Sequence, residues 1–174
     1  MRHDRGIWTL VVAGLALRLA LVWSGWAEGP LLADDAFYYF RIAANLAAGH
    51  GSTFDGLTPT NGYHPLWLGL LVPVFATFGA SVWLPVKVAL TLATVCDLVT
   101  GLAVIAIVRA LAGGARAALA AGFWFLTPLT VLISLRGMEA AVSAMFVALV
   151  FWRLARLTTR GSPPTAREAL ICGV

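Results

Sequence analysis

Long uninterrupted blocks of apolar residues constrain the fold of this chain more than any other feature. Such blocks fall at 7–26, 84–108, 117–135 and 139–157. A helix of about 20 residues is about 30 Å long, which matches the hydrocarbon core of a bilayer. Only 11% of the 174 residues are charged, against about 25% in an ordinary soluble domain. The sequence therefore predicts an all-α, polytopic transmembrane helical bundle.

The few charges and the two cysteines narrow the function. The net charge of +4 comes mostly from short loops, where it indicates membrane topology rather than a nucleic-acid partner. Cys96 and Cys172 both lie in apolar surroundings. They predict neither a disulfide framework nor a metal site.

The N-terminal apolar run has two interpretations. A basic start, an apolar stretch and the small residues of Gly25-Trp26-Ala27 are typical of a removed signal peptide. The run is long for that purpose and further hydrophobic segments follow it. We therefore interpret 7–26 as a retained first helix, with Arg2 and Arg5 keeping the N-terminus in the cytoplasm.

The segment 65–79 decides the topology. It has fifteen residues and contains Pro73, so a helix there is too short to cross the bilayer comfortably. If it crossed, the arginines at 109–116 and 153–160 would face outward. If it lies at the membrane surface, both clusters are cytoplasmic, as the positive-inside rule prefers. We therefore expect an outer loop at 27–64, a juxtamembrane segment at 65–79 and a cytoplasmic linker at 158–168.

The last residues begin another apolar run at Ala169, after a stretch that is broken by Pro, Gly and Ser. This pattern favours residues 1–174 as a single N-terminal module of a longer protein.

The outer loop carries an acidic pair, Asp34 and Asp35, at the start of a short amphipathic segment. An acidic start suits a helix N-terminus, so one of the two could simply cap that helix. One cap needs one carboxylate, and adjacent helical residues point about 100° apart. The second carboxylate is then free to face a cleft.

Turn chemistry accounts for other polar residues of the loop. Asp55-Gly56 and Asn61-Gly62 are turn dipeptides. His64 precedes a proline at the membrane edge, where it is either a solvated interfacial residue or a hydrogen-bond donor to a phosphate. Five aromatic residues in and beside the loop are typical of the aromatic belt at a membrane interface; they are Tyr38, Tyr39, Tyr63, Trp67 and Trp83.

The stretch "DDAFYYFRIAANLAAGHG" followed by "TNGYHPLW" resembles the first outer loop of GT-C fold glycosyltransferases. The resemblance is to bacterial relatives of protein mannosyltransferases and of the lipid A aminoarabinose transferase. Those proteins carry an acidic pair soon after the first helix and a His-Pro or Lys-Pro motif that opens a juxtamembrane segment. Here the pairs are Asp34-Asp35 and His64-Pro65. The resemblance covers 30–80 and extends more weakly through "RGMEAAV" at 136–142; family members are much longer.

The resemblance implies an inverting enzyme with a polyprenyl-phosphate sugar donor and a glycan, lipid or protein acceptor. It places the reaction at the outer side of the inner (plasma) membrane of a bacterium. It assigns the base to the first aspartate, Asp34, while helix phase leaves Asp35 open. The second carboxylate could orient the first, cap the helix or hold a divalent cation; no other cofactor is implied. The 174-residue module alone is expected to be inactive.

The same residues suit that chemistry on physical grounds. A positioned carboxylate that takes the proton of an acceptor hydroxyl contributes about 10²–10⁴-fold in rate. A departing phosphate needs cations or hydrogen-bond donors. Candidates for contact with the substrate are His64, Asn61, Lys87, Arg136 and Glu139. Glu139 could instead pair locally with Arg136, and Ala140 stands where the family often has a Thr.

Two charges fall inside predicted spans, Arg18 and Asp97. Each costs about 2.5–3.5 kcal/mol at the centre of an inserting helix. A pair between them would relieve both, while snorkelling of Arg18 to the surface is the alternative.

Other functions remain open. Intramembrane charges also occur in small-solute transporters, but those sites usually lie on broken helices in repeated halves. This chain shows no repeat and concentrates its polar residues in an outer loop. A non-catalytic fragment or membrane subunit with the same module is the further alternative.

Overall fold

The computed structural model describes residues 2–29 and 31–160, and within these ranges the chain is helical with no strand. An isolated bridge joins Thr53 and Pro59 in the outer loop. The helices are α1 (Arg2–Trp23), the 3-10 helix η1 (Gly25–Glu28), α2 (Asp34–Ala47), α3 (Pro65–Phe78), α4 (Leu84–Ala112), α5 (Gly114–Leu126), α6 (Pro128–Ser134) and α7 (Ala140–Arg160).

Three of these helices are long and apolar enough to cross a membrane, namely α1, α4 and α7. The bent pair of α5 and α6 makes a fourth span if it is counted as one. The class predicted from the apolar blocks, a helical membrane protein with several spans, agrees with this arrangement. Helix α3 has 14 residues and is about 21 Å long, less than the hydrocarbon core.

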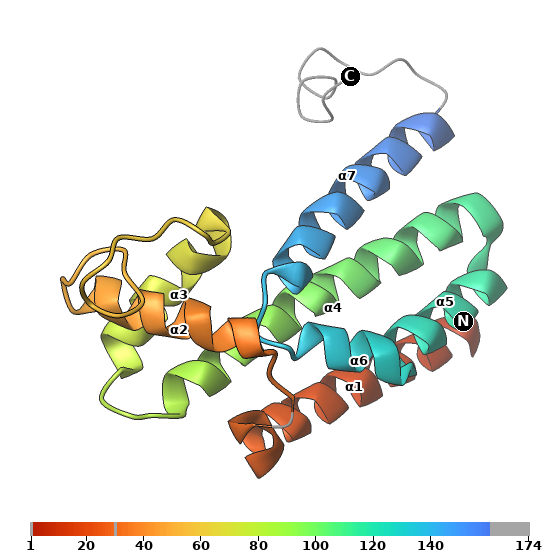
Figure 1. The fold of residues 1–174 in the computed structure, drawn as a ribbon. Coiled ribbons are helices and arrows are strands. Elements are labelled where there is room, and N and C mark those ends of the chain that lie inside the picture. Colours follow the sequence, from red (N-terminus) through yellow and green to blue (C-terminus); the bar gives the residue numbers. More distant parts are fainter. Residues whose placement is uncertain (1, 30, 161–174) are drawn as a thin grey trace.

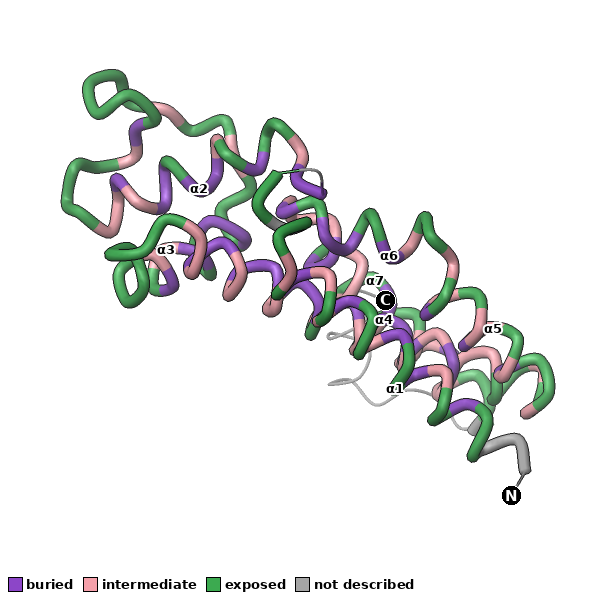
Figure 2. The backbone as a smooth tube through the Cα atoms, turned by 90° about the horizontal axis from the view of Figure 1, so that it is seen from below, coloured by how far each residue is buried: buried purple, intermediate pink, exposed green. Residues whose placement is uncertain are grey.

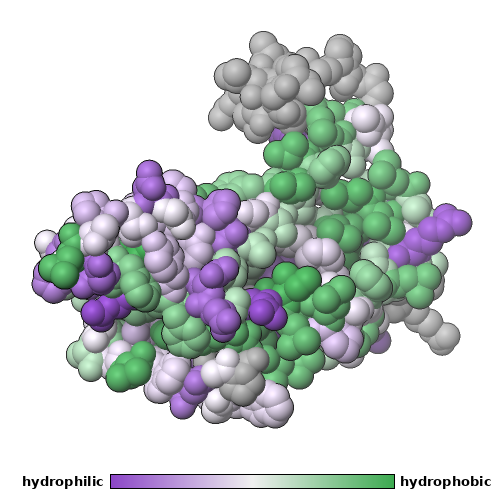
Figure 3. Space-filling model, in the orientation of Figure 1, coloured by the Kyte–Doolittle hydropathy of each residue, from purple (hydrophilic) through white to green (hydrophobic). Residues whose placement is uncertain are grey.

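Helix α4 is the central element of the bundle (Figure 1). It packs against α1, α5 and α7, while α2 packs on α3 beside the start of α4. Along the helices, buried and exposed positions alternate (Figure 2). Figure 3 shows hydrophilic residues gathered over the end that α2 and its loops form, whereas hydrophobic residues cover the helices beyond it.

Two apolar clusters hold the bundle together. The larger one joins α2 and α3 to the first half of α4 and to α6 and α7, with Trp67, Ile42 and Leu90 fully buried. The smaller one joins α1, α4 and α5 around Phe125. Burying such side chains contributes about 1.5–3 kcal/mol each in water, and close packing takes over that role inside lipid.

The predicted unbroken helix over 117–135 is wrong, because the chain bends by 55° between α5 and α6. Thr127 is extended and Pro128 starts the next helix. Proline has no N–H and its ring clashes with the carbonyl four residues earlier. The carbonyl of Trp124 therefore loses its helical donor at Pro128.

Arg18 supplies the missing donors. Its Nη1 donates to the carbonyl of Phe125 at 2.9 Å, and its Nη2 donates to that of Trp124 at 3.2 Å. The hydroxyl of Thr130 also donates to the Trp124 carbonyl, at 2.6 Å. Unpaired backbone groups are costly in a bilayer. These bonds therefore offset the cost of the break between α5 and α6.

The predicted Arg18–Asp97 pair is present. Nε of Arg18 lies 2.9 Å from Oδ2 of Asp97, and its N–H donates to the Ser134 hydroxyl at 3.3 Å. Arg18 is only 1% exposed. The snorkelling alternative is therefore not what the structure shows.

Helices α1 and α4 pack closely on α5, and this packing positions Arg18. A Cβ added to Gly14 would lie 2.5 Å from the Cβ of Phe125, and one added to Gly101 would lie 2.5 Å from the end of the same ring. Phe125 therefore fits between two glycines. Small residues at helix interfaces allow such close approach in membranes.

We expect Arg18→Met to lower stability by about 3–5 kcal/mol, because it leaves the Asp97 carboxylate buried without its partner. The double variant Arg18→Met/Asp97→Leu should recover only part of that loss, since the carbonyls of Trp124 and Phe125 still lack the donors that Arg18 gave them. Thermal unfolding in detergent micelles measures both. Arg5→Met, at an exposed position of the same helix, is the control. Equal midpoints for Arg18→Met and Arg5→Met would contradict this account.

The arginines predict which end of the bundle faces the cytoplasm. Arg5, Arg109 and Arg116 belong to the end of the bundle away from α2 and α3 (Figure 1). We expect this end to be cytoplasmic.

Cysteine labelling tests this orientation. In a Cys96→Ser, Cys172→Ser background, Leu57→Cys should react with an impermeant maleimide added outside intact cells. Ala115→Cys should react only after permeabilisation. Outside labelling of Ala115→Cys would reverse the orientation.

Candidate functional site

A turn at 136–139 brings the end of α6 against the start of α2. The N–H of Ala33 donates to the carbonyl of Arg136 at 3.0 Å. The indole Nε1 of Trp67, on α3, donates to the carbonyl of Gly137 at 3.1 Å. Trp67 is fully buried. Three segments that are distant in sequence, those at 33–39, 64–67 and 136–139, therefore meet at one place.

Gly137 allows this close approach. Its φ is +76°, a conformation that side chains disfavour. A Cβ at this position would also lie 2.8 Å from the Cβ of Ala36 and 3.1 Å from the ring of Phe40. Glycine is therefore required twice, for the backbone angle and for the space.

His64, Glu139 and Tyr39 form a polar group beside this turn. Nε2 of His64 lies 3.4 Å from Oε1 of Glu139, and the backbone N–H of His64 donates to the hydroxyl of Tyr39 at 3.0 Å. The His64 side chain is 67% exposed and that of Glu139 is 22% exposed. Oε2 of Glu139 is buried and has no hydrogen-bond partner among the described residues.

The surroundings of Tyr39 shift the pKa of its phenol. Burial raises the pKa of this phenol above its ordinary value, and the nearby carboxylates of Glu139 and Asp35 raise it further, against the opposing effect of the His64 N–H. Tyr39 therefore stays protonated at neutral pH. It presents a hydroxyl to Glu139 while it accepts from His64.

Both aspartates of the acidic pair are exposed and lie in the first turn of α2. The N-cap is Ala33, with no side-chain cap bond, so the capping alternative is not realised. Asp35 lies one turn before Tyr39 on the same helix face, and its charge reaches that phenol. Asp34 points along a different face. The structure thus brings the charge of Asp35 to the group of His64, Tyr39 and Glu139, while Asp34 is exposed on another face of α2.

The other predicted contact residues have mixed positions. Arg136 is exposed on the turn itself. Lys87 instead pairs with Glu28, with Nζ 2.8 Å from Oε1. Asn61 is exposed, and its carbonyl accepts the N–H of Tyr63 at 2.9 Å. Arg136 therefore belongs to the site, while the geometry gives Lys87 and Asn61 no direct place in it.

Asp55 has the turn role that its dipeptide suggests. Its Oδ1 accepts the N–H groups of Leu57 and Thr58 at 2.8 and 2.7 Å and the hydroxyl of Thr53 at 2.9 Å. These bonds hold the pKa of the Asp55 carboxyl well below its usual range. The carboxylate is occupied in ordering its own loop.

Sequence reasoning missed Tyr39 and Trp67 as parts of this site, since both read as members of an aromatic belt. The spacing of four residues between Asp35 and Tyr39 was the available signal for the first. No local pattern reports that the Trp67 indole reaches Gly137, which lies 70 residues away in the chain.

The described part of the chain contains no group of three or more His, Cys, Asp or Glu side chains that could hold a metal ion. What the segments offer is acid–base and anion chemistry: exposed carboxylates at the start of α2, an exposed imidazole and an exposed guanidinium.

We expect Gly137→Ala to lower stability by about 1–3 kcal/mol from the backbone angle, with a further loss because α2 must move away from the turn. Gly62→Ala is the matched control, because Gly62 is exposed, has no positive φ and has open space where the Cβ would be. Thermal unfolding in detergent compares the two. Equal midpoints would show that the turn does not hold α2 in place.

Comparisons of the chain with protein-family models, with curated proteins and with solved structures found no match.

Proposed function

We propose that this chain is an inverting glycosyltransferase, which moves a sugar from a polyprenyl-phosphate carrier to an acceptor hydroxyl at the outer face of the membrane. The observation that supports it most is the convergence at the turn. The acidic pair, His64 and the 136–139 segment are the regions that resemble GT-C enzymes, and the bonds from Ala33 and Trp67 to this turn hold them together.

The reaction needs few groups. The acceptor oxygen attacks the anomeric carbon from the side opposite the phosphate, so the new bond forms with inversion. The bond from that carbon to the phosphate oxygen breaks, and its electron pair stays on the phosphate. The hydroxyl proton passes to a carboxylate, which acts as a general base.

Asp34 and Asp35 divide these tasks in the proposal. Asp34 is exposed, so an acceptor hydroxyl can reach it, and it is the position that the resemblance favours. Asp35 lies toward Tyr39, and its negative charge raises the pKa of the Tyr39 phenol. His64 and Arg136, both exposed, are placed to receive the phosphate of the donor.

The transporter alternative rests on Arg18 and Asp97, and the contacts of these residues weaken it. The Arg18 guanidinium is taken up by the carbonyls of Gly14, Trp124 and Phe125, the Ser134 hydroxyl and Asp97. A transported solute would have to displace bonds on which the α5–α6 break depends. The pair therefore has a structural explanation.

We expect Asp34→Asn and Asp35→Asn to lower sugar transfer without loss of the fold. Because neither aspartate makes a cap bond, asparagine removes the proton acceptor and little else. The base position should lose about 10²-fold or more, and the other position should lose less. Transfer is measured with a labelled polyprenyl-phosphate sugar in membranes that contain the full-length protein.

Asp4→Asn, the same change at the predicted cytoplasmic end, is the control and should keep full activity. Donor binding, followed by retention of the labelled lipid, should persist in both pair variants. Near wild-type turnover in both variants would refute the proposed role of the pair.

A further inference from the structure

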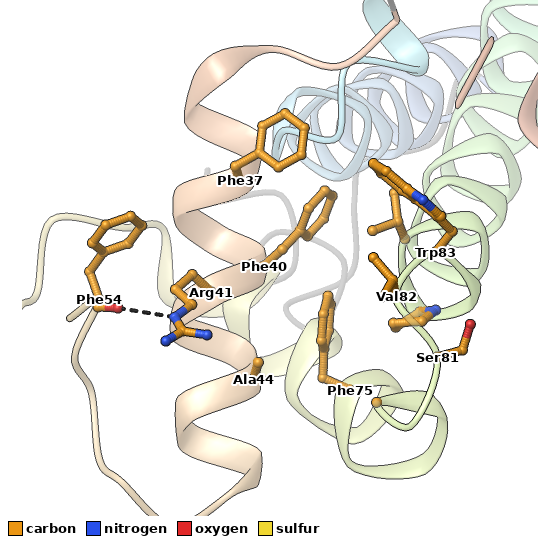
Figure 4. A pocket seen from close by; sticks show the side chains of 12 residues that line it. Phe37, Phe40, Arg41, Ala44, Phe54, Phe75, Ser81, Val82 and Trp83 are labelled. Atoms are coloured by element: carbon orange, nitrogen blue, oxygen red, sulfur yellow. Dashed lines mark hydrogen bonds between the residues drawn. The ribbon is translucent and has the colours of Figure 1, made fainter. Parts of the chain in front are cut away.

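Helix α2 has a second functional face, opposite the one that carries Asp35 and Tyr39. Phe37 and Phe40 point from α2 toward Phe75 and Trp83 across a cavity of about 500 Å³ (Figure 4). Its walls come from α2, the end of α3, the 79–83 loop and the first residues of α4. Cavities of about 300–1,000 Å³ are the size of small-molecule sites. This one is lined mainly by aromatic and aliphatic side chains.

A polar hollow of about 450 Å³ adjoins the aromatic cavity along α2. Arg41 and Ala44 line both spaces. The polar part also contains Asn45, His50 and Asp55. The two spaces therefore border the same residues of α2, one apolar and the other charged, which is the pattern that an amphiphile requires.

Helical periodicity separates this hollow from the candidate active site. Arg41, Ala44 and Phe37 are spaced by three and four residues, so they share one face of α2. Asp35 and Tyr39 lie on the other side of the same helix. A ligand in the hollow would thus leave Asp35 uncovered, whereas Asp34, three residues before Phe37, lies toward the hollow's side of α2.

The position of the aromatic cavity suits an acyl chain. Trp83, Pro85 and Val86 line it, and α4, which begins at Leu84, is one of the helices that can cross a membrane. Tryptophan at the end of a span is typical of the boundary between headgroups and hydrocarbon. The cavity thus lies beside the start of a helix that can span a membrane, at the level expected for lipid headgroups.

The polar hollow carries one fixed charge of each sign. Nε of Arg41 donates to the carbonyl of Phe54 at 3.3 Å (Figure 4), which orients the guanidinium. Its terminal nitrogens make no hydrogen bond to the other described residues, so they remain available as donors. Asp55 is ionised in its turn and fully exposed. A purely anionic headgroup would meet the Asp55 charge, whereas a zwitterion matches both.

We propose that this hollow binds one phosphatidylethanolamine molecule, with an acyl chain in the aromatic cavity, the phosphate at Arg41 and the ammonium group facing Asp55. The assignment goes beyond the proposed glycosyltransferase and does not depend on it. It makes α2 an element whose second face is completed by a bulk membrane lipid.

Native mass spectrometry of the delipidated full-length protein tests this assignment. The probes are phosphatidylethanolamine, phosphatidylcholine and phosphatidylglycerol with identical acyl chains, and undecaprenyl phosphate. Phosphatidylethanolamine should bind most tightly. Arg41→Gln should weaken it about tenfold or more, since a hydrogen bond to a charged group is lost. Arg136→Gln, the same change at the candidate active site, should have no effect.

Two cavity-filling variants test the acyl chain independently. Ala44→Phe narrows the junction of the two spaces, and Val82→Phe fills the aromatic part from the exposed 79–83 loop. Both should reduce binding, and Val82→Phe keeps the test valid if Ala44→Phe does not fold. Equal binding of phosphatidylglycerol, or tighter Arg41-dependent binding of undecaprenyl phosphate, would overturn the assignment. So would wild-type binding by Arg41→Gln and Val82→Phe.

Discussion

The guanidinium of Arg18 is the group on which the rest of the structure depends. A membrane span can break only where another part of the protein satisfies its freed carbonyls, and Arg18 does this for Trp124 and Phe125. The break turns α6 away from the axis of α5. The chain after α6 consequently reaches the end of the bundle as a tight turn, and this turn is where α2 and α3 attach.

Helix α2 thereby receives two different environments. On one side the turn at 136–139 and the start of α3 surround Tyr39 with polar groups from three segments. On the other side α3 and the start of α4 leave an aromatic space open. Buried residues of α2 separate the two environments, and among them Ala36 and Ala43 are fully buried.

The sequence predicted those features that depend on one simple property, such as the length of an apolar run or the cost of a buried charge. Apolar length located the spans, and the cost of isolated charges predicted the Arg18–Asp97 pair. The break at Pro128 was missed because hydropathy continues unchanged through it, although Thr127-Pro128 is visible in the sequence. The acidic pair and His64 were predicted from a pattern and stay predictions as site residues. Tyr39 and Trp67 were not, because their roles arise from partners that only the packed helices bring near.

The span of sequence that separates Arg18 from its partners has a consequence for biogenesis. Trp124, whose carbonyl it binds, follows it by 106 residues. At about 5–20 residues per second, a ribosome needs about 5–20 s to make that length. During this interval the first helix carries a charge whose partners on α5 and α6 have not been made. Its settled position in the membrane must therefore come late, when α5 arrives and Phe125 enters between α1 and α4.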